Sequence, residues 1–477
     1  MSDDTYTNKV FQVLRSFDAG EHKRLMKFLH SPYFNQSKTL AQLCGILIGF
    51  AEHAKPGFDR LALWQKLFPS EPYEDVNFRK YCSDLLKIME AFMVHENAER
   101  DEAKTALGVL DFVVRRKIEP LYNGAMKQAR NALEKQPYRS LDFYYQNYSI
   151  ERRYYALMDF DVRLNTKTNL EEIAFNLDLF YWIEKLKLYC AVLSQRKTGN
   201  QAYKLNFADE LISQLQRFPI EEVPALAIYY YSFLILTEEE NVEHYYNFRR
   251  MLDKYGMDMP QQEAMEMFDS ALHYCTGKIN KGQREFLQEY FNLFEDAITK
   301  GIFLLQGQLA PWRFNNIVVA ALRLGKMDWA EHFVEHYKTY LHEDSRQNVY
   351  SFNLARVLLY QHKYDRVLEL LQDVEYEDIF YNIISKAILT VTYYEMKEED
   401  ALDSFLESFR VFLIRNKNVT PQYRTLHLNL IKYVRRLIRL VPGDKTAIEK
   451  LRQEITREKS NTVNHEWLLE KLAEREG

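Results

Sequence analysis

Apolar residues recur at intervals of three and four positions along most of the chain, a spacing that predicts amphipathic helices rather than strands. Between residues 314 and 416 this pattern repeats three times, as a first helix, a tight polar turn and a second helix. The predicted turns are 324–328, 361–365 and 395–399. Because one pair of helices cannot bury its own apolar face, such a repeat predicts helix hairpins that stack on one another.

Each predicted second helix opens with a small or apolar residue, and a larger apolar residue follows four positions later. These pairs are Ala330 and Val334, Val367 and Leu371, and Ala401 and Phe405. The pattern resembles tetratricopeptide (TPR) repeats in a degenerate form, since only the first turn carries the expected glycine, Gly325. The resemblance implies an all-α, right-handed α-solenoid of helix hairpins with a groove for a peptide or a partner helix, and it implies no chemistry.

Two longer hairpins are predicted upstream, over about 224–255 and 262–298, and a helix that begins at Thr420 and Pro421 follows the repeats. In the last helix, Trp467, Leu468 and Leu472 are expected to cover the end of the stack. The predicted parts are an N-terminal helical domain (1–105), a helical middle region (106–219), TPR-like repeats (220–440) and C-terminal capping helices (441–477).

The N-terminal part contains several short helical patterns and then a longer one over about 77–95. Such an arrangement is compatible with a helix-turn-helix unit or with a helical cap on the solenoid. The cap is favoured, because no base-reading residue pattern stands out and the long helix mixes both signs of charge. The pattern leaves open whether this part is a separate domain or the first turns of the same superhelix.

Composition narrows the classes of function. Of 477 residues, 47% are apolar and 27% charged, as in ordered globular proteins, and the net charge of −5 provides no overall attraction to nucleic acid or to an anionic membrane. No run approaches the roughly 18 apolar residues of a membrane span, and the polar start at 1–5 has no apolar leader pattern, so a cytoplasmic protein is expected. The four cysteines are far apart and form no CxxC pair.

Two basic clusters are the candidate contact surfaces. Residues 115–139 include seven Lys or Arg against two Glu, and a predicted helix after Thr420 carries cations at i, i+3, i+4 and i+7. The candidate residues are Arg115, Arg116, Lys117, Lys432, Arg435, Arg436 and Arg439. They would suit an acidic partner or a phosphate backbone. The alternatives are a solvated helix face for the first cluster and complementation of the helix dipole for the second.

One motif suggests metal chemistry. His332, Glu335 and His336 match the H-x-x-E-H arrangement of inverted zinc peptidases. We reject this site, because Ala330, Val334 and their neighbours already form the buried side of that helix and turn the three polar residues outward. Phosphate-binding loops, dinucleotide-binding loops and nucleophile elbows are missing from the sequence, and no cofactor is expected.

The expected function is therefore non-enzymatic: a protein–protein interaction or scaffold module that binds a protein or peptide. A nucleic-acid-associated regulator that uses the basic clusters is the alternative, and a zinc hydrolase is the third hypothesis. The sequence identifies neither the partner nor the oligomeric state.

Overall fold

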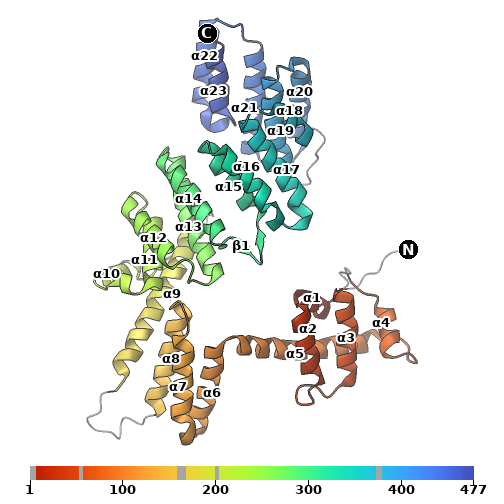
Figure 1. Cartoon of the computed structure of the whole chain (residues 1–477), viewed down its shortest axis with the longest axis vertical. Helices are drawn as coiled ribbons and strands as arrows, with labels where there is room; N and C mark the ends of the chain where they lie inside the picture. Colours follow the sequence, from red (N-terminus) through yellow and green to blue (C-terminus); the bar gives the residue numbers. More distant parts are fainter. Residues whose placement is uncertain (1–6, 53–56, 158–167, 199–202, 372–378, 477) are drawn as a thin grey trace. The chain divides into compact units, whose positions relative to one another are not determined.

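The computed structural model describes residues 7–52, 57–157, 168–198, 203–371 and 379–476. These residues are almost entirely helical, which confirms the predicted all-α class (Figure 1). The exception is a small antiparallel hairpin of β1 (Leu304–Leu305) and β2 (Gln308–Leu309). The polar start at 1–5, on which the expectation of no leader partly rests, lies outside the described residues.

Contacts divide the chain into two compact units, Met1–Lys185 and Leu186–Gly477. The division falls inside one long helix, α9 (Leu170–Thr198). The three predicted boundaries, after residues 105, 219 and 440, all lie within a unit, so they stay predictions.

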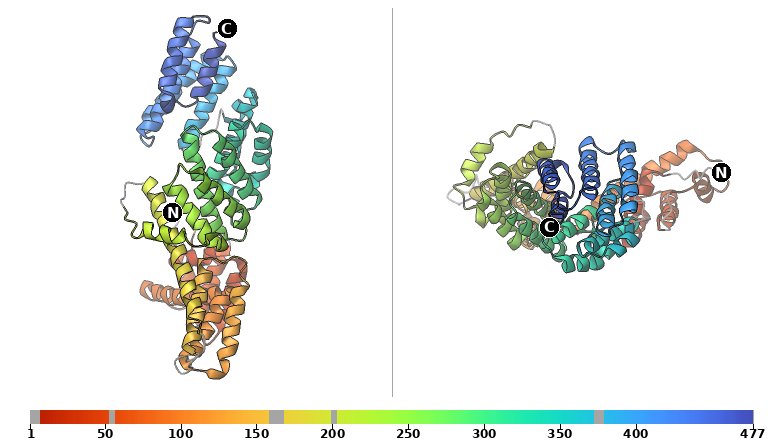
Figure 2. Two further views of the ribbon diagram at one scale, coloured as in Figure 1. Left: turned by 90° about the vertical axis from the view of Figure 1, so that its left-hand side faces the viewer. Right: turned by 90° about the horizontal axis from the view of Figure 1, so that it is seen from above.

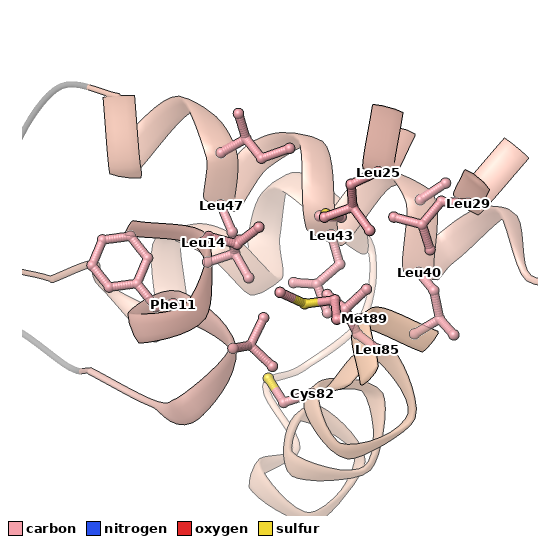
Figure 3. Close-up of a cluster of buried hydrophobic side chains, with 14 of the residues drawn as sticks. Phe11, Leu14, Leu25, Leu29, Leu40, Leu43, Leu47, Cys82, Leu85 and Met89 are labelled. Carbon is pink, nitrogen blue, oxygen red and sulfur yellow. The ribbon is translucent and has the colours of Figure 1, made fainter. Parts of the chain in front are cut away.

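The first unit begins with five helices around one core. They are α1 (Lys9–Ser16), α2 (Ala19–His30), α3 (Lys38–Glu52), α4 (Arg60–Leu67) and α5 (Asp75–Arg100). Leucines from α1, α2, α3 and α5 meet in this core, together with Phe11 and Met89 (Figure 3). The start of α2 is fixed by a capping box, in which Asp18 accepts from the backbone of Glu21 and the Glu21 side chain accepts from the backbone of Asp18.

Three further helices of the first unit, which ends within α9, pack on one another. They are α6 (Glu102–Arg116), α7 (Tyr122–Glu134) and α8 (Leu141–Leu157), with the short η1 (Glu119–Leu121) between α6 and α7. Arg130 of α7 binds the buried carboxylate of Glu151 of α8 through two hydrogen bonds of 2.8 and 2.7 Å. Pairing is required here because an isolated buried carboxylate is strongly disfavoured.

The second unit is a row of helix hairpins. After the rest of α9 come α10 (Ala208–Leu215), η3 (Ile220–Glu222), α11 (Pro224–Thr237), α12 (Val242–Tyr255), α13 (Gln261–Asn280), α14 (Glu285–Thr299), α15 (Pro311–Arg323), α16 (Met327–Tyr337), η4 (Lys338–Tyr340), α17 (Glu343–Tyr360), α18 (Tyr364–Leu371), α19 (Ile379–Glu395), α20 (Glu399–Arg415), α21 (Pro421–Ile438), α22 (Lys445–Arg457), η5 (Lys459–Asn461) and α23 (His465–Glu474).

Helices α11 to α20 form five hairpins, which are the five predicted from the sequence. Each odd-numbered helix from α11 to α19 packs against the even-numbered helix that follows it, and we call the odd-numbered helices the first helices. First helices also pack on one another, α11 on α13, α15 on α17 and α17 on α19. In the right-hand view of Figure 2 the teal and blue helices follow one another around a curve. The predicted solenoid of helix hairpins is confirmed.

The turns of the last three hairpins share one backbone conformation. Gly325, His362 and Lys397 each have a left-handed φ, of 72°, 58° and 60°. In each turn that residue donates its N–H to the carbonyl three residues earlier, and the next residue donates to the carbonyl five residues earlier, as in a Schellman motif. The turns are therefore equivalent, although only one contains the glycine that this conformation favours.

Because the three turns are equivalent, residues of the third hairpin can be aligned with those of the first two, and this alignment differs from the one predicted from the sequence. The residue five positions after the left-handed one is Ala330, Val367 and then Leu402, and all three are buried. Ala401, which the sequence pattern places at this position, is exposed, and the residue four positions after Leu402 is the buried Leu406, not Phe405. The prediction for Ala401 and Phe405 was wrong by one residue, because the third turn was placed at 395–399, one residue before the position equivalent to the other two turns.

Replacing Lys397 by glycine is expected to stabilise the second unit by about 0.5 kcal/mol. A non-glycine residue in the left-handed region costs about 1 kcal/mol, and the greater freedom of glycine in the unfolded chain offsets part of the gain. Conversely, Gly325→Ala should destabilise by about 1 kcal/mol through backbone strain alone, since a Cβ there would meet no neighbouring atom.

Chemical unfolding of these variants beside Lys397→Ala measures both effects. Lys397→Ala removes the same exposed side chain without relieving the backbone, so it should give no gain. Equal stability of the glycine and alanine variants would contradict a strained turn.

The end of the chain packs on the last hairpin as predicted. Leu468 and Leu472 of α23 are fully buried, and the ring of Trp467 packs edge-on against Tyr394 of α19. The Trp467 indole also donates a 2.7 Å hydrogen bond to Glu395. None of the helices in the described ranges combines the length and the apolar composition that crossing a bilayer requires.

Candidate partner-binding surface

The C-terminal basic cluster lies on α21, where neighbouring helices supply carboxylates to two of its members. Arg435 donates to Glu407 of α20 at 2.9 Å, and Arg436 donates to Glu454 of α22 at 3.2 Å. Lys432 lies over the ring of Tyr433, and Arg439 is exposed. Two of the four candidate residues therefore hold helices together, and a role of the cluster in binding stays a prediction.

The stability that the ion pair between Arg435 and Glu407 contributes is expected to depend on pH. Hydrogen bonds from Arg410 and Arg435 lower the pKa of Glu407 from 4.5 to about 2. A depressed folded-state pKa contributes stability that is present above about pH 4.5 and is lost as the pH falls toward about 2. Glu407→Gln should therefore lower the melting temperature slightly near pH 6, and the difference from wild type should vanish near pH 2. A difference independent of pH would contradict this ionic role.

The N-terminal basic cluster is divided in a similar way. Arg130 binds Glu151, and Lys135 binds Glu102 at 2.8 Å, so both cations hold helices of the first unit together. Arg115, Arg116 and Lys117 are exposed at the end of α6. Arg116 lies over the ring of Phe112, which is also exposed. The two basic clusters belong to different units, and the binding role of this one also stays a prediction.

The rejected zinc motif lies on α16. His332 and His336 are exposed and their rings stack on each other, whereas Glu335 binds Lys338 and the hydroxyl of Tyr350, both at 2.7 Å. These hydrogen bonds lower the pKa of Glu335 below its ordinary value, which makes the carboxylate a weaker base. Within the described ranges no group of three His, Cys, Asp or Glu side chains is arranged to hold a metal ion.

The four cysteines are buried free thiols. Burial raises the pKa of Cys82 to about 11 and of Cys44, Cys190 and Cys275 to about 12. Since the thiolate is the nucleophile and the metal ligand, these side chains are unreactive parts of the helix packing.

A cavity of about 300 Å³ lies between the C-terminal ends of α11 and α13 and is lined by residues that include Glu239, Lys278 and Lys281. Both lysines bind Glu240, at 3.4 and 2.8 Å, and Lys281 also binds Glu239. The hydrogen bond from Lys281 lowers the pKa of Glu240. The cations of this cavity are thus neutralised by the turn between α11 and α12.

A different arrangement surrounds Arg356, on the first helix α17. Three tyrosines with partly exposed side chains lie near it, Tyr360 of α17, Tyr381 of α19 and Tyr423 of α21, and the exposed Phe380 of α19 packs against Tyr423. We call these four residues the aromatic surface. Phe380 packs edge-on against Tyr423 with ring centroids 5.3 Å apart, so the surface continues from α19 to α21. Tyr360 and Phe380 are 42% and 44% exposed, although large aromatic side chains are usually buried.

Polar contacts between first helices fix the position of this surface. Asn315 of α15 donates a 2.7 Å hydrogen bond to the hydroxyl of Tyr381, and Asn353 of α17 donates one of 2.6 Å to the carbonyl oxygen of the Asn315 side chain. Phe352 packs edge-on against Tyr381 at 4.8 Å. These contacts connect three successive first helices, α15, α17 and α19. They also fix the orientation of Tyr381, through its hydroxyl and through its ring.

The sequence analysis missed Arg356. The available signal was a single charge within an otherwise apolar run, from Leu354 to Leu359. A charge in such a run is either neutralised by a neighbouring helix or directed to a ligand. Sequence alone does not distinguish these outcomes.

Comparison with known proteins gives no family assignment: no protein-family model matches the chain, and no curated protein matches its sequence. The function is therefore argued from the residues.

Proposed function

We propose that the chain is a non-enzymatic helical-repeat protein of the cytoplasm, a protein–protein interaction or scaffold module with TPR-like hairpins and no cofactor. Its partner is a protein segment that binds along α17, α19 and α21. The observation that carries this proposal is the aromatic surface, which is exposed on adjacent helices of a rigid stack. Aromatic residues are enriched in the centres of protein interfaces, where burying them contributes much of the affinity.

The architecture supports the same proposal. Each hairpin buries its apolar face against its neighbours, so the stack presents an extended rigid surface without further ordering of its backbone. A preformed surface loses little conformational entropy when it binds, and this favours affinity.

Copurification of the tagged full-length chain from its native host, with nuclease treatment and at low and high salt, tests the proposal. The double variant Tyr360→Ser/Phe380→Ser should lose partners that the wild type retains through both treatments. Phe112→Ser, which removes an exposed aromatic residue from the first unit, is the matched control and should retain them.

The opposite pattern would contradict the proposal. Partners that disappear with nuclease or with modest salt, and that are lost in Phe112→Ser but kept in the double variant, would place binding at the basic end of α6. The nucleic-acid-associated regulator would then replace the interaction module.

A further inference from the structure

The guanidinium of Arg356 differs from the other arginines of the stack in the neighbours that the structure describes around it. Among the described residues, no carboxylate lies within ion-pair distance of this side chain and no hydrogen-bond acceptor is paired with it. Its main contact is with the ring of Phe352, whose centroid lies 4.4 Å from the guanidinium carbon. Burial lowers the pKa of Arg356 to about 10, so the group remains charged at neutral pH.

Arg313, on the neighbouring first helix α15, provides a comparison within the same stack. Arg313 is buried, whereas Arg356 is partly exposed, and Arg313 also lies over aromatic rings, those of Phe303 and Trp312. Asp269 of α13 accepts two hydrogen bonds from it, at 2.5 and 2.6 Å. Within the described part of the stack, one arginine among aromatic rings is thus neutralised by a carboxylate, and the other is not.

We infer that Arg356 is the binding site for an aspartate or glutamate side chain of the partner segment, and this inference rests on the proposed function. Arg356 is partly buried beside aromatic rings, where a charge-assisted hydrogen bond to an external carboxylate is stronger than in open water. The planar guanidinium suits a carboxylate because two of its N–H groups can bind the two oxygens together.

The surroundings favour a carboxylate on a protein over a phosphate backbone. Nucleic acids are bound by rows of cations that each contact a phosphate, whereas Arg356 is a single cation bordered by rings. The tyrosine hydroxyls are neutral and can donate to an acidic side chain. The rings of the aromatic surface would pack on apolar residues beside the acidic one.

Selection from a phage-displayed library of random 16-residue peptides tests the inference. Wild-type full-length chain should enrich peptides that share an acidic position, and Arg356→Gln should not. For a selected synthetic peptide, changing that Glu to Gln should weaken binding to the wild type by about 10- to 100-fold and should leave binding to Arg356→Gln nearly unchanged. Arg323→Gln, an exposed arginine of α15, is the matched control and should behave as wild type.

The remaining outcomes each overturn a defined claim. Peptides that bind the wild type and Arg356→Gln equally would refute the carboxylate site while supporting the interaction module. Enrichment of phosphate-dependent ligands only would reassign the site to phosphate. Failure of any peptide to bind would contradict the proposed function and the inference together. A lower melting temperature of Arg356→Gln with unchanged peptide affinity would show that the residue is structural.

Discussion

Replacing Asp269 by alanine is expected to destabilise the second unit by about 3–5 kcal/mol, the largest effect we predict for a single substitution. The change removes the only carboxylate that the described residues place within ion-pair distance of Arg313, which is 4% exposed. An uncompensated buried guanidinium then remains between α13 and α15. Urea unfolding followed by circular dichroism measures the loss.

A double variant separates the ion pair from general damage to the stack. Asp269→Ala/Arg313→Met removes both charges and keeps an apolar side chain over Phe303 and Trp312, so it should recover most of the lost stability. If the double variant is less stable than Asp269→Ala alone, the arginine contributes through packing and the account of this pair is wrong.

Leu406→Ala is expected to cost about 2–5 kcal/mol, because Leu406 is fully buried in the core that α20 shares with α21. Phe405→Ala should cost about 1 kcal/mol or less, although phenylalanine is the larger residue, because its ring is partly exposed. Chemical unfolding of the two variants in parallel measures the difference.

This comparison tests the corrected register of the third hairpin directly. Both variants place alanine at adjacent positions of one helix, so helix propensity contributes nearly equally to each. If Phe405→Ala costs as much as Leu406→Ala, the register inferred from the sequence pattern is the better description.

The hairpins could be predicted from the sequence because each leaves a local signal. Proline at the starts of α11, α15 and α21, polar turns and a helical apolar spacing mark the helices without knowledge of their neighbours. The two long hairpins upstream of the repeats were predicted for the same reason. Such signals act within one segment, because the residues of that segment alone determine its backbone conformation.

Features that depend on contacts between segments, such as the register of a turn or the partner of a charged side chain, could not be predicted. The third hairpin was misaligned by one residue, because its left-handed turn is made with Lys397 and no glycine marks the position. Arg435 and Arg436 were treated as members of one stripe, yet adjacent residues on a helix point about 100° apart. They therefore meet carboxylates of different helices, Glu407 and Glu454.

Arg356 and Arg313 show that the partners of charged side chains at the candidate site could not be predicted from the sequence either. Each is a charge within an apolar first helix, and the sequence around them gives no sign of which has a carboxylate partner. Asp269 of α13 reaches Arg313 of α15 only in the assembled stack. The residue that we propose as the carboxylate site was thus found from its surroundings in the described part of the stack, which the sequence around it does not reveal.

Hydrogen–deuterium exchange of the full-length chain, alone and with a copurified partner, tests the central claim most directly. The account predicts slower exchange in peptides from α17, α19 and α21 around the aromatic surface, with little change in α6 or α7. Protection confined to the end of α6, or to the cavity between α11 and α13, would contradict it.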